Sequence, residues 1–533
     1  MEQPSPLILG VSGMRGIVAG SLTTRVATGY AMAFGRWLGE RFDGERVRVV
    51  IGRDGRCGGE AIQDAAIQGL LRAGCDVLRA GVVMTPTAAV LTDAHAAHGA
   101  LVVTASHNPQ EWNGLKCLVR LDRRRPVDAC APPEDLASQI IDRFNDSEPC
   151  SGAGTGSSGG TIRGVPDGAT THVNAVLARK SLVAPVRSRG YRVVLDSLNA
   201  SGAPAGRLLL DRLGCRIVEH LGSDASGVFP HTPEPTRENL VGLCEAVPRN
   251  GADVGFAQDP DGDRLAIVDE RGRYIGEEYT LVLAAESLLG GKGTEAQRHR
   301  GTEAQRHRGT EAQRHRGTEA QRHRGTEAQR HEGTEGTDRV ICVNLSTSRM
   351  IDDVAAGHGA RVVRTRVGEA NVVEAMKRLR DEGHNVVLGG EGNGGVIWPE
   401  VVCVRDSLSA MALVLSLMAR TAQPISELVG QTPAYAIEKR KVDLPSREAA
   451  EPAIERVASH FAEPAHAESA AGGTAKAPAI DRQDGVRVDL PGRRSWVHVR
   501  ASNTEPIMRL VAEAPGAPEA RALLDEAMGV IGL

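Results

Sequence analysis

The sequence predicts an α/β protein in which one strand-and-helix unit occurs three times. Three apolar runs typical of buried strands, residues 99–103, 253–257 and 385–388, each lead directly into a polar loop. Strand-like runs alternate with helical patterns through most of the chain, an alternation typical of largely parallel sheets. At 533 residues the chain is too long for one hydrophobic core, so we expect about three or four domains.

The first unit spans residues 1–150. It opens with an apolar strand over 7–19 that is interrupted by the glycine-flanked Arg15, whose guanidinium could approach an anion. Apolar periodicity then predicts helices near 26–41, 59–73 and 87–97 and strands at 47–51, 76–83 and 99–103. The turn after the last strand places the Ser106 hydroxyl where open α/β sheets bind ligands.

A Gly/Ser-rich stretch, residues 151–165, is predicted to be a linker. The second unit, residues 166–272, has three aspartates in the turn after its last buried strand: Asp259, Asp261 and Asp263. Three hard oxygen ligands this close together suit Mg²⁺, and they would repel one another without a cation.

A calcium-binding helix-loop-helix is the alternative interpretation of this turn. Aspartates at its first, third and fifth positions and Glu270 at the twelfth fit that pattern. However, Arg264 stands where the calcium loop needs glycine, and the flanking segments have the pattern of strands. These departures favour magnesium.

The third unit, residues 273–430, contains an insertion at 293–336 in which an octapeptide repeats. A period of eight with alanine as the only apolar residue per copy builds no apolar face, so we expect a disordered surface segment. Its histidines allow a metal-binding interpretation, but identical copies favour a tandem duplication tolerated in a loop. The unit ends in a glycine-rich loop whose Glu391 and Asn393 could bind sugar hydroxyls.

The last domain, residues 435–533, has a polar segment between two strand-like runs. Guanidiniums, hydroxyls and an amide gather there, from Arg500, Ser502, Asn503, Thr504 and Arg509. These groups have the chemistry of a phosphate cradle. The alternative is an ordinary polar turn with surface arginines.

Composition excludes several classes of function. The 63 basic and 67 acidic residues are interspersed, and the net charge of −4 leaves no basic stripe for nucleic acid. Nine cysteines, an odd number with no Cys-x-x-Cys pair, fit reduced thiols. No apolar run predicts a membrane span or a targeting segment. We therefore expect a cytoplasmic protein, a monomer or homodimer, that binds a small anion through local arginines.

Lys116 is the only lysine among the first 179 residues of an arginine-rich chain. Arginine stays protonated at any accessible pH, whereas a desolvated lysine can exchange a proton. Lys116 is therefore a candidate for proton transfer, with a chance surface lysine as the alternative.

Four motifs, in this order, resemble the signature loops of the α-D-phosphohexomutase family. They are Thr-Ala-Ser-His-Asn-Pro around Ser106, Asp-Pro-Asp-Gly-Asp-Arg from Asp259, Gly-Glu-Gly-Asn-Gly-Gly around Glu391, and Arg-Ala-Ser-Asn-Thr-Glu-Pro from Arg500. The resemblance spans the chain apart from its insertions. It implies three related α/β domains and a smaller C-terminal α+β domain around a central cleft.

The resemblance also implies roles for individual residues. Ser106 would be a phosphoserine, whose phosphate would hold Mg²⁺ together with the three aspartates. Lys116 would act as general acid/base, with Arg15, Arg264 and His107 as further catalytic candidates beside it. Glu391 and Asn393 would bind the sugar, and the other phosphate would lie against Arg500, Ser502, Asn503, Thr504 and Arg509. The family usually has serine at position 393, so Asn393 bears on the choice of sugar.

The reaction implied is interconversion of hexose 6-phosphate and 1-phosphate through a 1,6-bisphosphate, which would also serve as activator. Phosphoglucosamine mutase is the favoured activity, and phosphomannomutase/phosphoglucomutase is the alternative. A non-catalytic sugar-phosphate sensor would not need Ser106, and a phosphatase would release inorganic phosphate. A hydrolase based on Ser106 and His107 is disfavoured because the Gly-x-Ser-x-Gly turn is missing.

Overall fold

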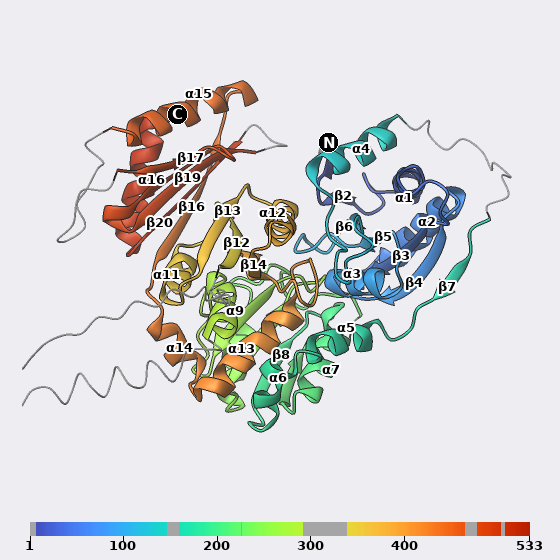
Figure 1. Cartoon of the computed structure of the whole chain (residues 1–533), viewed down its shortest axis with the longest axis horizontal. Coiled ribbons are helices and arrows are strands. Elements are labelled where there is room, and N and C mark those ends of the chain that lie inside the picture. Colours follow the sequence, from blue (N-terminus) through green and yellow to red (C-terminus); the bar gives the residue numbers. More distant parts are fainter. Residues whose placement is uncertain are drawn as a thin grey trace, which may run out of the picture.

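The computed structural model describes residues 7–146, 159–224, 226–290, 338–463, 477–502 and 507–532. They form three α/β domains with mixed sheets and a C-terminal domain with an antiparallel sheet, which confirms the predicted fold class. In Figure 1 the first domain lies at the right and the C-terminal domain at the upper left, with the other two between and below them. The predicted insertion at 293–336 lies outside the described residues.

The first domain contains the strands β1 (Ile8–Gly10), β2 (Gly13–Ile17), β3 (Arg48–Arg53), β4 (Asp76–Val82), β5 (Gly99–Val103), β6 (Trp112–Val119) and β7 (Ile162–Gly164). Its helices are α1 (Thr24–Arg41), α2 (Gly59–Arg72), α3 (Thr85–Ala94) and α4 (Glu134–Asn145). The sheet order is β1-β2-β6-β5-β3-β4-β7. Because β7 pairs with β4, part of the segment interpreted as the linker 151–165 supplies the edge strand of this sheet.

The second domain contains α5 (Gly168–Leu177), α6 (Lys180–Arg187), β8 (Arg192–Asp196), α7 (Gly202–Arg212), β9 (Arg216–Leu221), α8 (Val241–Arg249), β10 (Val254–Gln258) and β11 (Leu265–Asp269). The third contains α9 (Glu278–Leu289), β12 (Arg339–Asn344), α11 (Met350–Gly357), β13 (Arg361–Thr365), α12 (Glu369–Asp381), β14 (Asn385–Glu391), β15 (Gly395–Ile397), α13 (Ser407–Thr421) and α14 (Ile425–Gln431). Their sheet orders are β11-β10-β8-β9 and β13-β12-β14-β15.

The C-terminal domain contains β16 (Ala436–Asp443), α15 (Ala450–Phe461), β17 (Ala479–Asp481), β18 (Val486–Leu490), β19 (Ser495–Ala501), β20 (Ile507–Ala514) and α16 (Ala517–Ile531). Its sheet, ordered β16-β20-β19-β18-β17, is antiparallel throughout. Both helices pack on this sheet through a hydrophobic core that belongs to this domain alone.

The same four-strand arrangement recurs in the three α/β domains. Each contains three parallel strands, with the first strand of the unit in the middle and a fourth strand antiparallel to the third: β6-β5-β3-β4, β11-β10-β8-β9 and β15-β14-β12-β13. The turn between the third and fourth strands is therefore equivalent in the three domains. These three turns carry Ser106, the three aspartates, and Glu391 with Asn393.

Buried contacts join the first three domains to one another. Helix α13 packs on α9 and on α6, and its residues from Ser407 to Ala419 are all buried, as expected for a helix that is apolar on every side. Asp406 caps this helix through the Leu408 and Ser409 amides and also lies 3.1 Å from Nε2 of His172 on α5. The first domain is joined to the second by packing of α3 on α5 and by the Thr85 amide, which donates to the Asp261 carbonyl oxygen at 2.9 Å. Together these contacts hold the three equivalent turns close to one another.

Among the described residues, no single helix is long and apolar enough to cross a membrane. Helices α13 and α14 reach the required length and composition only when taken together, and they meet at an angle of 86°.

Candidate active site

Ser106 lies at the start of the turn between β5 and β6, with 2% of its surface exposed. Its φ of +50° lies in the left-handed region, which costs a non-glycine residue about 1 kcal/mol or more. Two contacts hold it there: its amide donates to Thr104 Oγ1 at 2.9 Å, and the Arg56 guanidinium donates to its carbonyl oxygen. The strained backbone aims the hydroxyl at the second domain, where Oγ donates to Asp259 Oδ2 at 3.3 Å.

Arg56 holds the backbone of this turn in place through several contacts. This role was not predicted from the sequence. Its guanidinium also donates to the carbonyl oxygen of Trp112 at 2.7 Å, and its Nε pairs with Asp54 at 2.9 Å. Both side chains of this ion pair are fully buried. Asp54 in turn accepts from Thr104 Oγ1 at 2.7 Å, so one polar network fixes both ends of the serine turn.

We expect Arg56→Met to lower the free energy of unfolding of the first domain by about 3–5 kcal/mol, because it leaves Asp54 buried without its cation. Urea unfolding, with hydrogen exchange of the β3 and β5 amides, measures this change. Arg53→Met is the matched control, since Arg53 pairs with the exposed Glu60 and its loss should cost about 1 kcal/mol or less. Equal effects of the two substitutions would refute the proposed role of Arg56.

The three aspartates are fully buried, and one carboxylate oxygen of each lies within 4.8 Å of the others. Asp261 Oδ2 accepts from Thr85 and from Lys116, and Asp263 Oδ2 accepts from Lys116 and from Arg405. The Oδ1 atoms of Asp261 and Asp263 are buried and have no hydrogen-bond partner among the described residues. Unpartnered carboxylate oxygens beside the Ser106 hydroxyl fit a hard divalent cation such as Mg²⁺.

Electrostatics indicate that the aspartate cluster needs positive charge. Burial and the proximity of Asp263 and Asp261 raise the pKa of Asp259 well above its usual range. Burial also acts to raise the pKa of Asp263, but Arg405, Lys116 and Arg264 outweigh it and hold that pKa far below its usual range. The cluster therefore depends on cations from several segments of the chain.

Lys116 is on β6, opposite Val102 of β5, and not in the turn itself. Its Nζ donates to Asp261 Oδ2 at 3.0 Å and to Asp263 Oδ2 at 2.9 Å. Although burial lowers the pKa of this lysine, the two aspartates and Glu369 raise it above its ordinary value. These two ion pairs favour the ammonium form of Lys116.

The other candidates of the first two domains surround the same turn. Arg15 donates to Asn108 Oδ1 at 3.0 Å, and the Arg264 amide donates to Asp259 Oδ1 at 3.1 Å. Nδ1 of His107 lies 3.3 Å from Ser106 Oγ. Burial, together with Arg264 and Arg15, lowers the pKa of His107 to about 3, so its imidazole is neutral at ordinary pH.

The two candidates for sugar binding, Glu391 and Asn393, lie next to the aspartates. The segment that carries them, from the end of β14 to the start of β15, is called the sugar loop below. Glu391, at the end of β14, is 5% exposed and accepts from Asn344 Nδ2 at 2.8 Å. Asn393 follows in the turn, 3.5 Å from Glu391 Oε2 through its amide nitrogen. Arg405 also contacts Glu391, and neither Arg405 nor its partner Glu369 was predicted, because no motif marks them.

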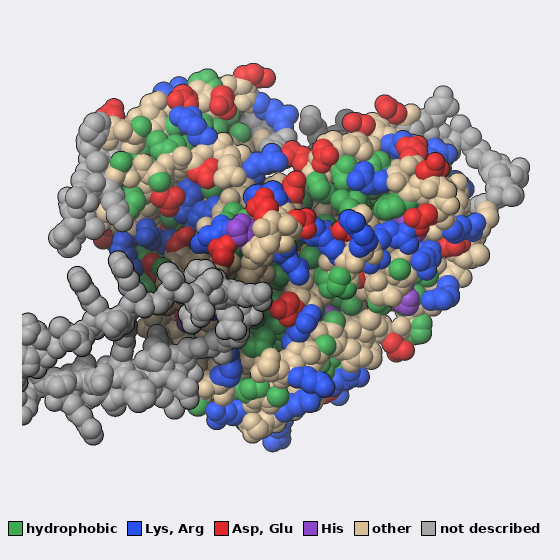
Figure 2. Space-filling model, viewed as in Figure 1, with side chains coloured by type: hydrophobic (Ala, Val, Ile, Leu, Met, Phe, Trp, Pro, Cys, Tyr) green, Lys and Arg blue, Asp and Glu red, His purple; other side chains and the backbone are tan. Residues whose placement is uncertain are grey.

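Two cavities meet at Glu391. One, of about 550 Å³, is lined by Arg15, Lys116, Glu369, Glu391 and Arg405, and the other, of about 470 Å³, by Glu391, Asn393, Lys441, Arg500 and Arg509. Figure 2 shows the molecule indented between the first and C-terminal domains, with side chains of both charges at the base of the indentation. The first cavity is lined by Lys116 and Arg405, which contact the buried aspartates, and the second is lined by the arginines of the C-terminal domain.

A row of cations crosses the C-terminal sheet where it lines the second cavity. Lys441 of β16 lies opposite Arg509 of β20, which lies opposite Arg500 of β19. Like charges on directly paired residues repel, so the row favours a bound anion. Lys441 was not predicted. Ser502 immediately follows β19, and the predicted ligands Asn503 and Thr504 lie outside the described residues.

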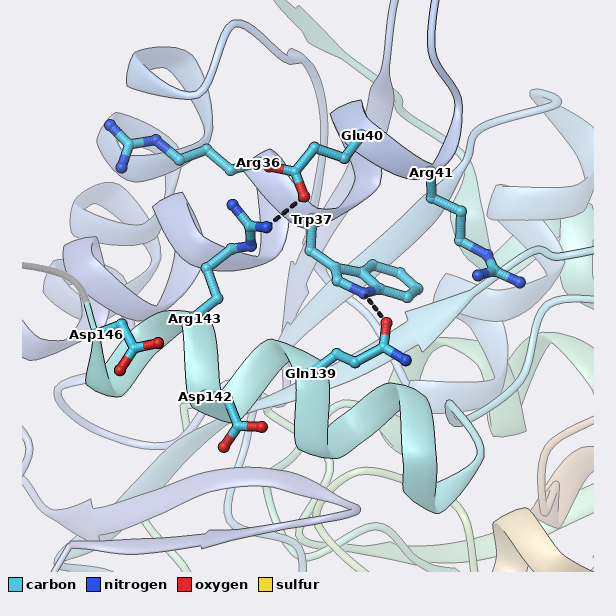
Figure 3. A pocket seen from close by; sticks show the side chains of 8 residues that line it. All are labelled: Arg36, Trp37, Glu40, Arg41, Gln139, Asp142, Arg143 and Asp146. Carbon is cyan, nitrogen blue, oxygen red and sulfur yellow. Dashed lines mark hydrogen bonds and ion pairs between the residues drawn. The ribbon is translucent and has the colours of Figure 1, made fainter.

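A larger hollow, of about 730 Å³, lies on the first domain between α1 and α4 (Figure 3). Trp37 Nε1 donates there to Gln139 at 3.0 Å, and Arg143 pairs with Glu40. None of the residues that line it belongs to the three equivalent turns or to the cation row. We therefore place the active site in the cleft, where the reactive groups converge.

Comparison with known proteins identifies the family of this chain. Family models of the phosphoglucomutase/phosphomannomutase α/β/α domains I, II and III match residues 6–130, 170–272 and 325–435, and the model of the C-terminal domain matches 441–530. The chain belongs to the α-D-phosphohexomutase family. It is thus a phosphohexomutase, an intramolecular phosphotransferase.

Curated relatives of this phosphohexomutase have two different names. A phosphoglucomutase/phosphomannomutase of Thermococcus kodakarensis is 33% identical, with 97% of each chain covered. A probable phosphoglucosamine mutase of Methanopyrus kandleri is 31% identical, covering 98% of this chain and 97% of the relative. Both are similar along their full length, so overall similarity does not separate the two activities.

Solved structures share the fold of this phosphohexomutase. A phosphoglucomutase/phosphomannomutase family protein from Burkholderia thailandensis superimposes with a TM-score of 0.71 at 24% identity, covering 98% of both chains. An Aspergillus fumigatus N-acetylphosphoglucosamine mutase, complexed with GlcNAc-6P and magnesium, superimposes with a TM-score of 0.51 at 14% identity, covering 99% and 96%. A variant of that fungal enzyme is complexed with glucose 1,6-bisphosphate.

Proposed function

We propose that this enzyme interconverts hexose 6-phosphates and 1-phosphates by way of a phosphorylated Ser106. The observation that carries the proposal is the Ser106 hydroxyl, held in a strained turn 3.3 Å from Asp259 in a buried cluster of three aspartates. A binding protein would gain nothing from a strained hydroxyl at this position.

Phosphoryl transfer requires in-line positioning and neutralisation of the charge on the phosphoryl oxygens. Asp259, Asp261 and Asp263, with an oxygen of the Ser106 phosphate, would hold Mg²⁺, which neutralises carboxylate and phosphoryl charge when bound. Arg15 and Arg264 stand beside the serine turn and supply further positive charge there.

In the transfer step, the phosphorus–oxygen bond to Ser106 Oγ breaks as a sugar hydroxyl oxygen forms the new one. The proton of that hydroxyl passes to a base, and the same group, now protonated, gives that proton to the leaving Ser106 Oγ, so the step balances. We assign Lys116 as the base, because its Nζ contacts two of the aspartates and a buried lysine amine can exchange a proton. His107, neutral beside Ser106 Oγ, orients the hydroxyl.

The cation row formed by Lys441, Arg509 and Arg500 would hold the phosphate that is not being transferred. The bisphosphate formed would reverse its orientation in the cleft, presenting its other phosphate to Ser106. The same bisphosphate would load an unphosphorylated enzyme, so we propose it as activator, in line with the fungal complex described above.

For the sugar, we propose glucosamine phosphate. Glu278, at the start of α9, lies against the sugar loop: a β-carbon added to Gly392 would be 2.1 Å from its carboxylate. Burial and the neighbouring Glu277 raise the pKa of Glu278 well above its usual range, so a bound ammonium would stabilise its charged form. Glu278 and Glu391 together favour an amino sugar over a neutral one. Glucose and mannose phosphates are the second candidates, supported by the 33% identical relative.

Comparing kcat/KM for the phosphates of glucosamine, glucose, mannose and N-acetylglucosamine, with Mg²⁺ and a catalytic amount of bisphosphate, tests this choice. We expect a preference of about tenfold or more for glucosamine phosphate, the worth of one charge-assisted hydrogen bond. Glu278→Gln should remove that preference while sparing turnover of glucose phosphate. Equal or better turnover of glucose or mannose phosphate would support the second candidates, and release of inorganic phosphate would indicate a phosphatase. A cytoplasmic location stays part of the proposal.

A further inference from the structure

Arg405, just before α13, contacts carboxylates from three separate segments of the cleft. Its Nη2 lies 2.7 Å from Asp263 Oδ2 in the aspartate turn, and its Nη1 lies 2.5 Å from Glu391 Oε2 in the sugar loop. Its Nε lies 2.7 Å from Glu369 at the start of α12. Its side chain is only 10% exposed. One rigid guanidinium therefore joins the turn that would hold the metal ion to the loop that would bind the sugar.

These contacts determine which oxygen atoms remain available to ligands. Arg405 and Lys116 both occupy Asp263 Oδ2, and Asp263 Oδ1 is the atom left buried without a hydrogen-bond partner among the described residues. On Glu391, Arg405 holds Oε2 while Asn344 and the Gly368 amide hold Oε1. The orientations of both carboxylates thus depend on the same side chain.

The path of Arg405 to these partners depends on a glycine. A β-carbon added to Gly395 would lie 2.2 Å from Arg405 Cδ, well inside contact distance. Any larger residue at position 395 would push the guanidinium away from its partners. Gly395→Ala therefore offers a way to displace Arg405 without changing any charge.

We propose that Arg405 is a positioning residue that couples the aspartate turn to the sugar loop, so that Mg²⁺ and hexose phosphate bind cooperatively. The proposal rests on the proposed function for the identity of the two ligands. A cation that orders Asp263 also orders Arg405, and hence Glu391, which lowers the cost of binding the sugar. By reciprocity, bound sugar phosphate tightens Mg²⁺ to the same extent.

Titration calorimetry on the full chain in a Ser106→Ala background tests this coupling without turnover. We expect Mg²⁺ to tighten glucosamine 6-phosphate by about fivefold or more, and this factor to fall below about twofold in Arg405→Met and in Gly395→Ala. Arg207→Met, an exposed arginine on α7, and Gly430→Ala, where an added β-carbon meets nothing within 4 Å, are matched controls that should keep the full coupling.

If Arg405→Met fails to fold, Arg405→Lys still tests the proposal. Lysine retains the buried positive charge but lacks the planar guanidinium that contacts all three carboxylates. With no sugar present, we expect Arg405→Lys to weaken the Mg²⁺ Kd by about tenfold, since Asp263 loses its fixed orientation. An unchanged Mg²⁺ Kd in Arg405→Lys, or unchanged coupling in folded Arg405→Met, would overturn the proposal. If the parent protein binds no hexose phosphate, the proposed function fails, and the Mg²⁺ comparison alone still decides the role of Arg405.

Discussion

Ser106→Ala should lower mutase turnover by at least about 10⁴-fold, because it removes the hydroxyl that we propose carries the phosphoryl group. Binding of sugar phosphate should survive, since the cation row and Glu391 lie in other domains and keep their contacts. Coupled assays of turnover and calorimetric titration with hexose 6-phosphate measure the two effects separately.

A second variant separates chemistry from backbone strain. Ser106→Gly removes the hydroxyl and also relieves the cost of φ at +50°, so it should be as inactive as the alanine variant and no less stable. Ser188→Ala, on the exposed surface, is the matched control and should retain full turnover. Turnover near the wild-type value in either Ser106 variant would show that the phosphoryl group travels by another route.

Lys116→Met should lower turnover by about 10²–10⁴-fold, the usual contribution of a positioned acid/base group. It also removes a cation that competes for Asp261 and Asp263, so the affinity for Mg²⁺ should be kept or increased. Steady-state kinetics and Mg²⁺ titration together check this opposite response of the two quantities.

Lys116→Arg distinguishes proton transfer from simple charge. Arginine preserves the positive charge between the aspartates but does not release a proton, so this variant should also be strongly impaired. Lys180→Met, an exposed lysine of α6, should behave like the wild type. High turnover of Lys116→Arg would mean that position 116 contributes charge alone, and another base would then have to be sought.

The fold and the three equivalent turns were predictable because both depend on local patterns. Each turn follows a short apolar run that is bounded by turn residues, and a run of this length favours a buried strand with polar groups at its end. β6 was not predicted, because Asn113, Gly114 and Lys116 interrupt its apolar pattern. This strand pairs with β5 on one side and with β2 on the other.

Arg56 and Arg405 could not be found in the sequence, because the contacts that connect them to the site are with residues distant along the chain. Arg56 reaches the Ser106 carbonyl across 50 residues, and Arg405 reaches Asp263 across 142. Both arginines stand among many others in an arginine-rich chain, and only the tertiary arrangement shows which are buried among carboxylates. Lys441 was missed because it joins the cation row through strand register alone.

Phosphorylation of Ser106 is the most direct test of the proposed chemistry. The purified full-length chain would be incubated with glucose 1,6-bisphosphate and Mg²⁺, and its phosphorylation mapped by mass spectrometry of intact protein and peptides. We predict one added phosphoryl group, on the peptide that contains Ser106, and none in Ser106→Ala. Turnover with no phosphoryl group on Ser106, or with one on a different residue, would contradict the assignment.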